Sequence, residues 1–150
     1  MSTTIADFLA NDHGRLLSLF REFQDTDSSD LEKRRERFHR FCKDMDRHGR
    51  WVGSTLFAQI KDRIQPNQRE ALQKFVGKEP ERIEEQINAI REHLEDGNPD
   101  TSSLEEQLLS TLQDHFNKEE RILYPLFDEH LTDEEVSELL SQFNDELSDV

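Results

Sequence analysis

The chain has 150 residues, of which 34 are Asp or Glu and 19 are Lys or Arg, so its formal net charge at pH 7 is −15. Its length is that of one domain with one core. Its charge excludes a nucleic-acid-binding protein that neutralises phosphates, and argues against docking on an anionic membrane. The single cysteine, Cys42, excludes an intramolecular disulfide and a CxxC zinc site. The first residues lack the basic and apolar regions of a signal peptide, and no apolar run is long enough to cross a bilayer, so we expect a cytoplasmic location.

Apolar residues recur at alternating spacings of three and four, the period of amphipathic helices, along five segments. These segments span about residues 4–24, 30–64, 67–96, 103–127 and 133–147. Four residue pairs of the capping-box type mark helix starts: Ser29 with Glu32, Asn67 with Glu70, Ser103 with Glu106, and Thr132 with Glu135. The pattern predicts a single all-α domain over residues 1–150, an antiparallel up-down-up-down four-helix bundle with a short C-terminal fifth helix.

Four polar residues lie where the inner faces of these helices should be apolar: His13, His48, His115 and Glu119. A single histidine in a core is usually hydrogen-bonded and has no further role. Three histidines on three helices, with a carboxylate one turn after the last, instead indicate a shared transition-metal site.

The spacing of these residues indicates an internal repeat. His48 follows His13 by 35 residues, and the residue 35 positions before His115 is Pro80. When His48 is aligned with His115, Val52 falls on the position of Glu119. The chain therefore reads as two helical hairpins of one ancestral pattern, with Pro80 in a histidine position and Val52 in a glutamate position.

The stretches Asp12-His13 and His115-Phe-Asn-Lys-Glu119-Glu120-Arg-Ile-Leu-Tyr-Pro125 resemble the motifs of hemerythrin-like proteins with the HHE cation-binding domain. The resemblance extends from about Ile5 to His130. It implies an up-down-up-down bundle with a non-heme di-iron centre that binds oxygen or nitric oxide, or senses iron or redox state. It assigns His13 and His48 to one iron and His115 to the other, with Glu119 as the bridge.

The chain departs from that family pattern at two ligand positions, because neither Val52 nor Pro80 can bind a metal. An intact di-iron centre is therefore not expected, and we expect at most one iron or zinc ion, at His13, His48 and Glu119 with His115 close by. Glu84, one turn beyond Pro80, is a substitute carboxylate or a solvated charge. Pro80 also predicts that a helix begins near it, with residues 67–76 as a separate short helix.

Two functions follow from these patterns. The first is a metal-binding domain that binds or senses rather than catalyses, with a small diatomic ligand if the metal is iron. The second is a metal-free interaction module, for which the tail helix either caps the bundle or offers an apolar face to a protein partner or a homodimer. That face consists of Val136, Leu139, Leu140, Phe143 and Leu147. No pattern of an enzyme stands out; Cys42 is expected to be a buried inert thiol, Trp51 a core residue, and Tyr124-Pro125 the end of the fourth helix.

Overall fold

The computed structural model describes residues 4–98 and 100–148, with the side chains of residues 74, 75 and 145–148 left out. All regular elements among those residues are helical, which confirms the predicted all-α fold. In chain order they are α1 (Ile5–Gln24), α2 (Leu31–Arg50), the π-helix η1 (Trp51–Leu56), α3 (Phe57–Ile60), α4 (Pro66–Glu95), α5 (Ser102–Lys118), the π-helix η2 (Glu119–Leu123), α6 (Tyr124–His130) and α7 (Asp133–Ser148).

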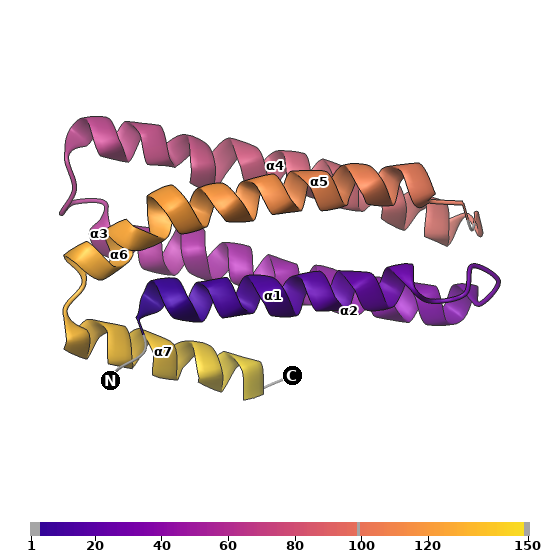
Figure 1. The fold of residues 1–150 in the computed structure, drawn as a ribbon, viewed down its shortest axis with the longest axis horizontal. Coiled ribbons are helices and arrows are strands. Elements are labelled where there is room, and N and C mark those ends of the chain that lie inside the picture. The colour runs from indigo at the N-terminus through magenta and orange to yellow at the C-terminus, as the bar shows by residue number, and fades with distance from the viewer. Residues whose placement is uncertain (1–3, 99, 149–150) are drawn as a thin grey trace.

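The long helices α1, α2, α4 and α5 lie lengthwise beside one another, and successive ones are joined at opposite ends of the molecule (Figure 1). The segment that continues α5 leads through η2 into α6, and α7 then folds back beside α1. Within the described part of the chain, no helix combines the length and the apolar character that a membrane span requires.

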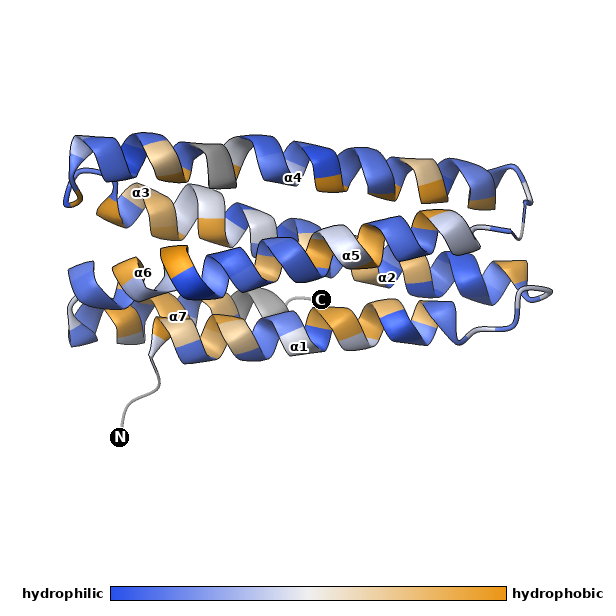
Figure 2. Ribbon diagram, turned by 45° about the horizontal axis from the view of Figure 1, so that its top comes forward, coloured by the Kyte–Doolittle hydropathy of each residue, from blue (hydrophilic) through white to orange (hydrophobic). Residues whose placement is uncertain are grey.

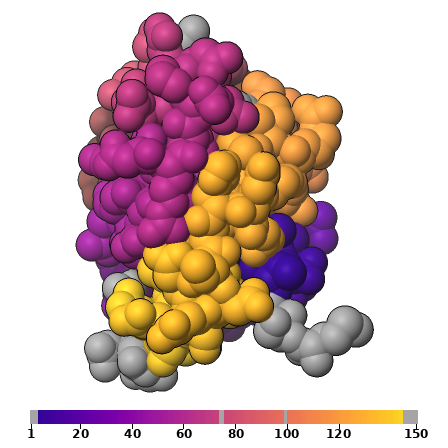
Figure 3. Space-filling view, turned by 90° about the vertical axis from the view of Figure 1, so that its left-hand side faces the viewer, coloured from indigo at the N-terminus to yellow at the C-terminus, as the bar shows by residue number. Residues whose placement is uncertain are grey.

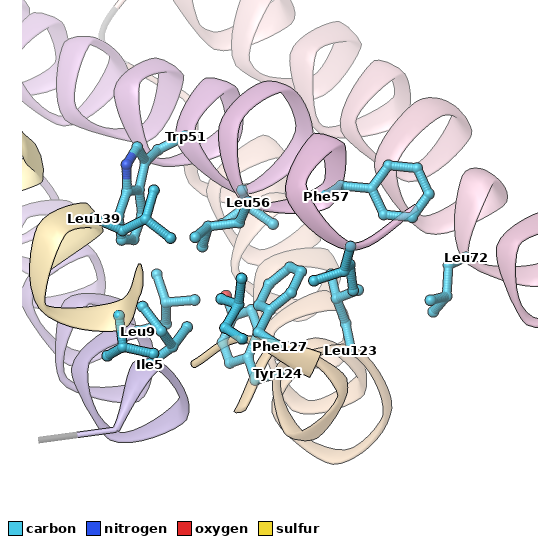
Figure 4. Packing of buried hydrophobic residues seen from close by; sticks show 14 of the residues in the cluster. Ile5, Leu9, Trp51, Leu56, Phe57, Leu72, Leu123, Tyr124, Phe127 and Leu139 are labelled. Atoms are coloured by element: carbon cyan, nitrogen blue, oxygen red, sulfur yellow. The ribbon is translucent and has the colours of Figure 1, made fainter. Parts of the chain in front are cut away.

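The apolar faces of the helices form two separate clusters of buried residues. Hydrophobic and hydrophilic residues alternate around each long helix, as Figure 2 shows. The first cluster, here called the loop-end core, joins α1, α2, α4 and α5 and includes Phe20, Phe41 and Ile90. The second, the tail-end core, joins the start of α1 to η1, α3, α6 and α7 (Figure 4). His13, His48, His115 and Glu119 belong to neither cluster, and in the sequence His13, His48 and Glu119 each lie between a member of one cluster and a member of the other.

The tail helix α7 caps the bundle rather than leaving its apolar face free. Val136, Leu139 and Phe143 are buried in the tail-end core, and Leu140 packs against it. Figure 3 shows α6 and α7 lying across this end of the molecule, beside α1. The side chain of Leu147, the last residue of the predicted apolar line, is outside the described residues.

Two predicted interruptions of helices are absent from the structure. α4 is continuous from Pro66 to Glu95 with Pro80 inside it, so the predicted break before Pro80 is wrong. The carbonyl that Pro80 cannot bond is that of Val76, which lies beside Gly53 of η1. Tyr124-Pro125 does not end the fourth helix either, because the chain remains helical through η2 and α6 to His130.

Of the four helix starts predicted from capping-box pairs, one is confirmed. The other three helices have their N-cap residue one or two positions away from the predicted one. Thr132 and Glu135 form the reciprocal capping box that their spacing predicts, with bonds of 3.0 and 3.1 Å. α2, α4 and α5 instead have Asp30, Gln65 and Thr101 as N-cap residues. Boundary shifts of this size follow from local competition among neighbouring polar side chains.

The sequence patterns did not predict that Arg34, near the loop end of the bundle, is buried. Arg34 is 3% exposed and donates to the carbonyls of Phe23 and Thr26, the hydroxyl of Thr101 and the carboxylate of Glu105. It thereby joins α2 to the end of α1 and to the start of α5.

Replacement of Arg34 should destabilise the fold strongly, because it would leave the buried carboxylate of Glu105 without its cation. We expect Arg34→Ala to lower the free energy of unfolding by about 3–5 kcal/mol, measured by urea denaturation. Arg40→Ala, at an exposed position of the same helix, is the control and should change it by less than about 0.5 kcal/mol. Equal losses in the two variants would contradict a structural role of the buried Arg34 group.

The contact of α7 with Trp51 offers a second test. The ring of Phe143 is fully buried, with its centroid 4.5 Å from Trp51 and 5.2 Å from Phe8. Phe143→Ala should cost about 3–5 kcal/mol of stability and shift the emission of Trp51, the only tryptophan, to the red. The exposed neighbour Gln142→Ala should leave both unchanged. Unchanged emission in Phe143→Ala would show that α7 does not cover this end in solution.

Candidate metal centre

The candidate centre lies inside the bundle, between the loop-end core and the tail-end core. α1 supplies His13, the end of α2 supplies His48, α5 supplies His115, and η2 begins at Glu119. All four side chains are buried, with exposed fractions of 1% to 5%. His13, His48 and Glu119 each offer one ligand atom, and these three atoms lie within 4.8 Å of one another.

The carboxylate of Glu119 is the point on which the three histidine rings converge. Its Oε1 lies 3.1 Å from Nε2 of His13 and 3.8 Å from Nε2 of His48. Its Oε2 lies 3.4 Å from Nε2 of His115. The structure thus brings together all four residues that the sequence analysis selected, with His115 on the other oxygen of the carboxylate.

A second carboxylate holds the opposite nitrogen of each ring. Nδ1 of His48 donates to Asp12 at 2.7 Å, Nδ1 of His115 to Glu79 at 2.9 Å, and Nδ1 of His13 to Glu120 at 3.1 Å. The His13 ring also stacks on Phe116, with 3.8 Å between the centroids. These contacts leave Nε2 of every ring directed at Glu119. Carboxylates that orient histidine ligands in this way are a regular part of metal sites.

The charges of the centre stabilise one another. Burial alone would lower the pKa of His48, but its hydrogen bonds to Asp12 and Glu119 outweigh burial and raise that pKa to about 9. Burial would likewise raise the pKa of Glu119, but the three histidines hold it well below its usual value. Without a metal, the raised pKa of His48 therefore places positive charge beside the buried carboxylate.

Asp12 links His48 of the centre to the guanidinium of Arg15. Asp12 accepts from His48 on one oxygen and pairs with the Arg15 guanidinium, at 2.8 Å, through the other. Burial opposes ionisation of Asp12, but His48 and Arg15 together lower its pKa below the usual range. Asp12 therefore faces His48 as a negatively charged acceptor.

Tyr124 belongs to the centre, although the sequence analysis placed it only at a helix end. Its hydroxyl lies 2.7 Å from Nε2 of His13 and 3.3 Å from Nε2 of His48, and donates to Oε1 of Glu119 at 2.9 Å. Tyr124 follows Glu119 by five residues, a spacing that does not share a face of a regular α-helix. The π-helix η2 begins at Glu119 and widens that turn, so that the side chain points back to the centre.

The internal repeat is visible in the two π-helices. η1 follows His48 and η2 follows His115, and the two segments are aligned by the same offset that aligns these histidines. In the first hairpin Val52 and Phe57 stand where the second has Glu119 and Tyr124. The first half of the repeat is therefore apolar at both positions, and the polar half alone carries a carboxylate and a hydroxyl.

A cavity of about 590 Å³ reaches the centre between α2 with η1 on one side and α4 on the other. His48, His115 and Glu119 line it, as do Val52 and Pro80, the residues at the two altered ligand positions. Glu84 is also part of its wall, but its side chain is exposed. Cys42 lines the cavity too, and burial raises the pKa of its thiol to about 11, as expected for an inert thiol.

The donor set fits one transition-metal ion. Two imidazoles and one carboxylate suit iron or zinc and leave positions for further ligands. Two ions held side by side fit less well, since Val52 and Pro80 bring no donor atom to the cavity wall.

Comparison with known proteins gives one match. Residues 71–150 match the family model of the hemerythrin HHE cation-binding domain, and this range includes His115, Glu119 and Tyr124. No curated protein and no solved structure matches the chain. The family match covers more than half of the sequence. The chain belongs to the family of the hemerythrin HHE cation-binding domain.

Proposed function

We propose that this chain is a hemerythrin-type domain, an up-down-up-down bundle, that binds a single iron or zinc ion and acts in binding or sensing rather than in catalysis. Its ligands are Nε2 of His13, Nε2 of His48 and a carboxylate oxygen of Glu119, with His115 on the other carboxylate oxygen. The observation that carries the proposal is the set of three carboxylates that fix the three rings with Nε2 inward. Carboxylates that fix the orientation of histidine rings are typical of metal sites, whereas a packed core does not require them.

The surroundings of the ion suit reversible binding of a small molecule. A site with two histidines and one carboxylate leaves coordination positions open, and the cavity beside His48 and Glu119 gives a route to them. With iron in place, a diatomic molecule is the ligand that we propose. The chain itself holds and orients the donors, and the apolar cores on both sides exclude bulk water.

The alternative is a metal-free interaction module. The valine and proline at two family ligand positions favour it, and Glu119 is then held by its contacts with the histidine rings and with the Tyr124 hydroxyl. Metal uptake decides between the two functions.

Titration of chelator-treated protein with Zn²⁺, and with Fe²⁺ under anaerobic conditions, should give one ion per chain. His13→Ala removes one of three ligands and should lower the affinity for either ion by at least about tenfold. His93→Ala is the matched control, since among the described residues its ring bonds the carbonyl of Ala89 in its own helix and none of the proposed ligands, and it should bind as the unaltered chain does. No uptake of either ion would overturn the proposal in favour of the interaction module. Two irons per chain, with the spectrum of a bridged pair, would overturn the single-ion site.

The role of Asp12 gives a second test of this proposal. Asp12→Asn removes the negative charge that faces Nδ1 of His48, so we expect zinc affinity to fall by about 10- to 100-fold at an unchanged stoichiometry of one. Asp7→Asn, an exposed carboxylate on the same helix, is the control. Calorimetric titration measures both. An Asp12→Asn variant that folds and binds zinc with unchanged affinity would show that this carboxylate does not position the ligand.

A further inference from the structure

The hydroxyl of Tyr124 contacts all three proposed ligands of the metal. It lies within 2.7 to 3.3 Å of Nε2 of His13, Nε2 of His48 and Oε1 of Glu119. When the metal binds, a group that contacts all three donors leaves, stays as a hydrogen-bond donor to Glu119, or becomes a ligand itself. The packing of the tyrosine ring decides whether it can leave.

The ring of Tyr124 has no room to swing away. It is fully buried in the tail-end core and lies against Phe127, with 6.0 Å between the ring centroids (Figure 4). Protein cores are close-packed, so a rotated ring would displace these neighbours. Its hydroxyl would also lose its partners in apolar surroundings, which costs free energy. The oxygen therefore remains beside the metal position.

In the metal-free chain, burial and the Glu119 carboxylate hold the pKa of the Tyr124 hydroxyl well above its usual value, so an anionic oxygen there requires the positive charge of a bound cation. Glu119 is the only carboxylate among the three proposed ligands, because Val52 replaces its repeat counterpart. A phenolate adds a second negative charge and a hard oxygen donor, which ferric iron binds in preference to zinc. When the iron–oxygen bond forms, the O–H bond breaks and its proton passes to solvent, with no change in oxidation state.

We propose that Tyr124 is a ligand of ferric iron in this centre, which becomes a site of two histidines, one carboxylate and one tyrosinate. This inference rests on the proposed metal-binding function and makes it specific for iron in its ferric state. Tyrosinate bound to ferric iron absorbs visible light through charge transfer from the phenolate. Tyr124 is the only tyrosine of the chain, so such a band has a single possible tyrosinate source.

The test is to load the full chain with ferric iron, supplied as its nitrilotriacetate complex, and to record iron content, visible absorption and resonance Raman spectra. The unaltered chain should hold one iron and show the charge-transfer band with phenolate vibrations. Tyr124→Phe keeps the ring and should lose the band. The double variant Tyr124→Phe with Phe57→Tyr again has one tyrosine, at the equivalent position of the other half of the repeat, and should show no band.

The possible results separate the two proposals. One iron per chain without phenolate vibrations would overturn ligation by Tyr124 and leave the metal-binding function standing. A band that persists in Tyr124→Phe would belong to another residue, such as Cys42, and would also overturn it. A chain that takes up neither ferric iron, ferrous iron nor zinc would overturn both. Weaker iron binding in Tyr124→Phe, with no band in the unaltered chain, would make Tyr124 a positioning residue only.

Discussion

Glu119 holds a carboxylate that is 4% exposed at the middle of the bundle, and an ionised carboxylate at this depth requires positive charge and hydrogen bonds around it. The three histidines and Tyr124 meet this requirement, and three further carboxylates hold the histidines in turn. The resulting polar layer divides the apolar interior into two cores. The raised pKa of His48 puts positive charge beside Glu119 in the metal-free chain, and a metal ion at the same nitrogens would supply positive charge in place of the proton.

The helices could be predicted from the sequence because their apolar spacing is regular and their connections are short. The continuity of α4 through Pro80 could not be predicted, because the effect of this proline depends on the neighbouring helix. A proline inside a helix removes one hydrogen bond, and sequence rules therefore place a boundary there. In this bundle α4 packs beside Gly53 of η1 at the freed carbonyl of Val76 and continues. Tertiary packing thus overrides the local preference.

The candidate centre could be predicted in part. His13, His48, His115 and Glu119 stood out because polar side chains on an apolar helical face are costly without a function. Tyr124 did not stand out, because residues three or four apart share a face only in an α-helix. In a π-helix the fifth residue returns to the same face. Asp12, Glu79 and Glu120 were also missed, since acidic residues are frequent in this chain and look like solvated surface. Only the packing of the helices shows that each meets a histidine ring.

The two aligned hairpins of the chain differ in chemistry at two equivalent positions. Both have a π-helix after the histidine, yet the first half has Val52 and Phe57 where the second has Glu119 and Tyr124. Two facing carboxylates would double the charge that the interior must neutralise, and an apolar replacement of a buried charge is often neutral or stabilising. The valine and Pro80 also line the cavity that opens onto the remaining donors. The same two residues therefore bring no donor atom to one side of the centre and line the opening to the other side, which is the arrangement that the proposed single-ion site requires.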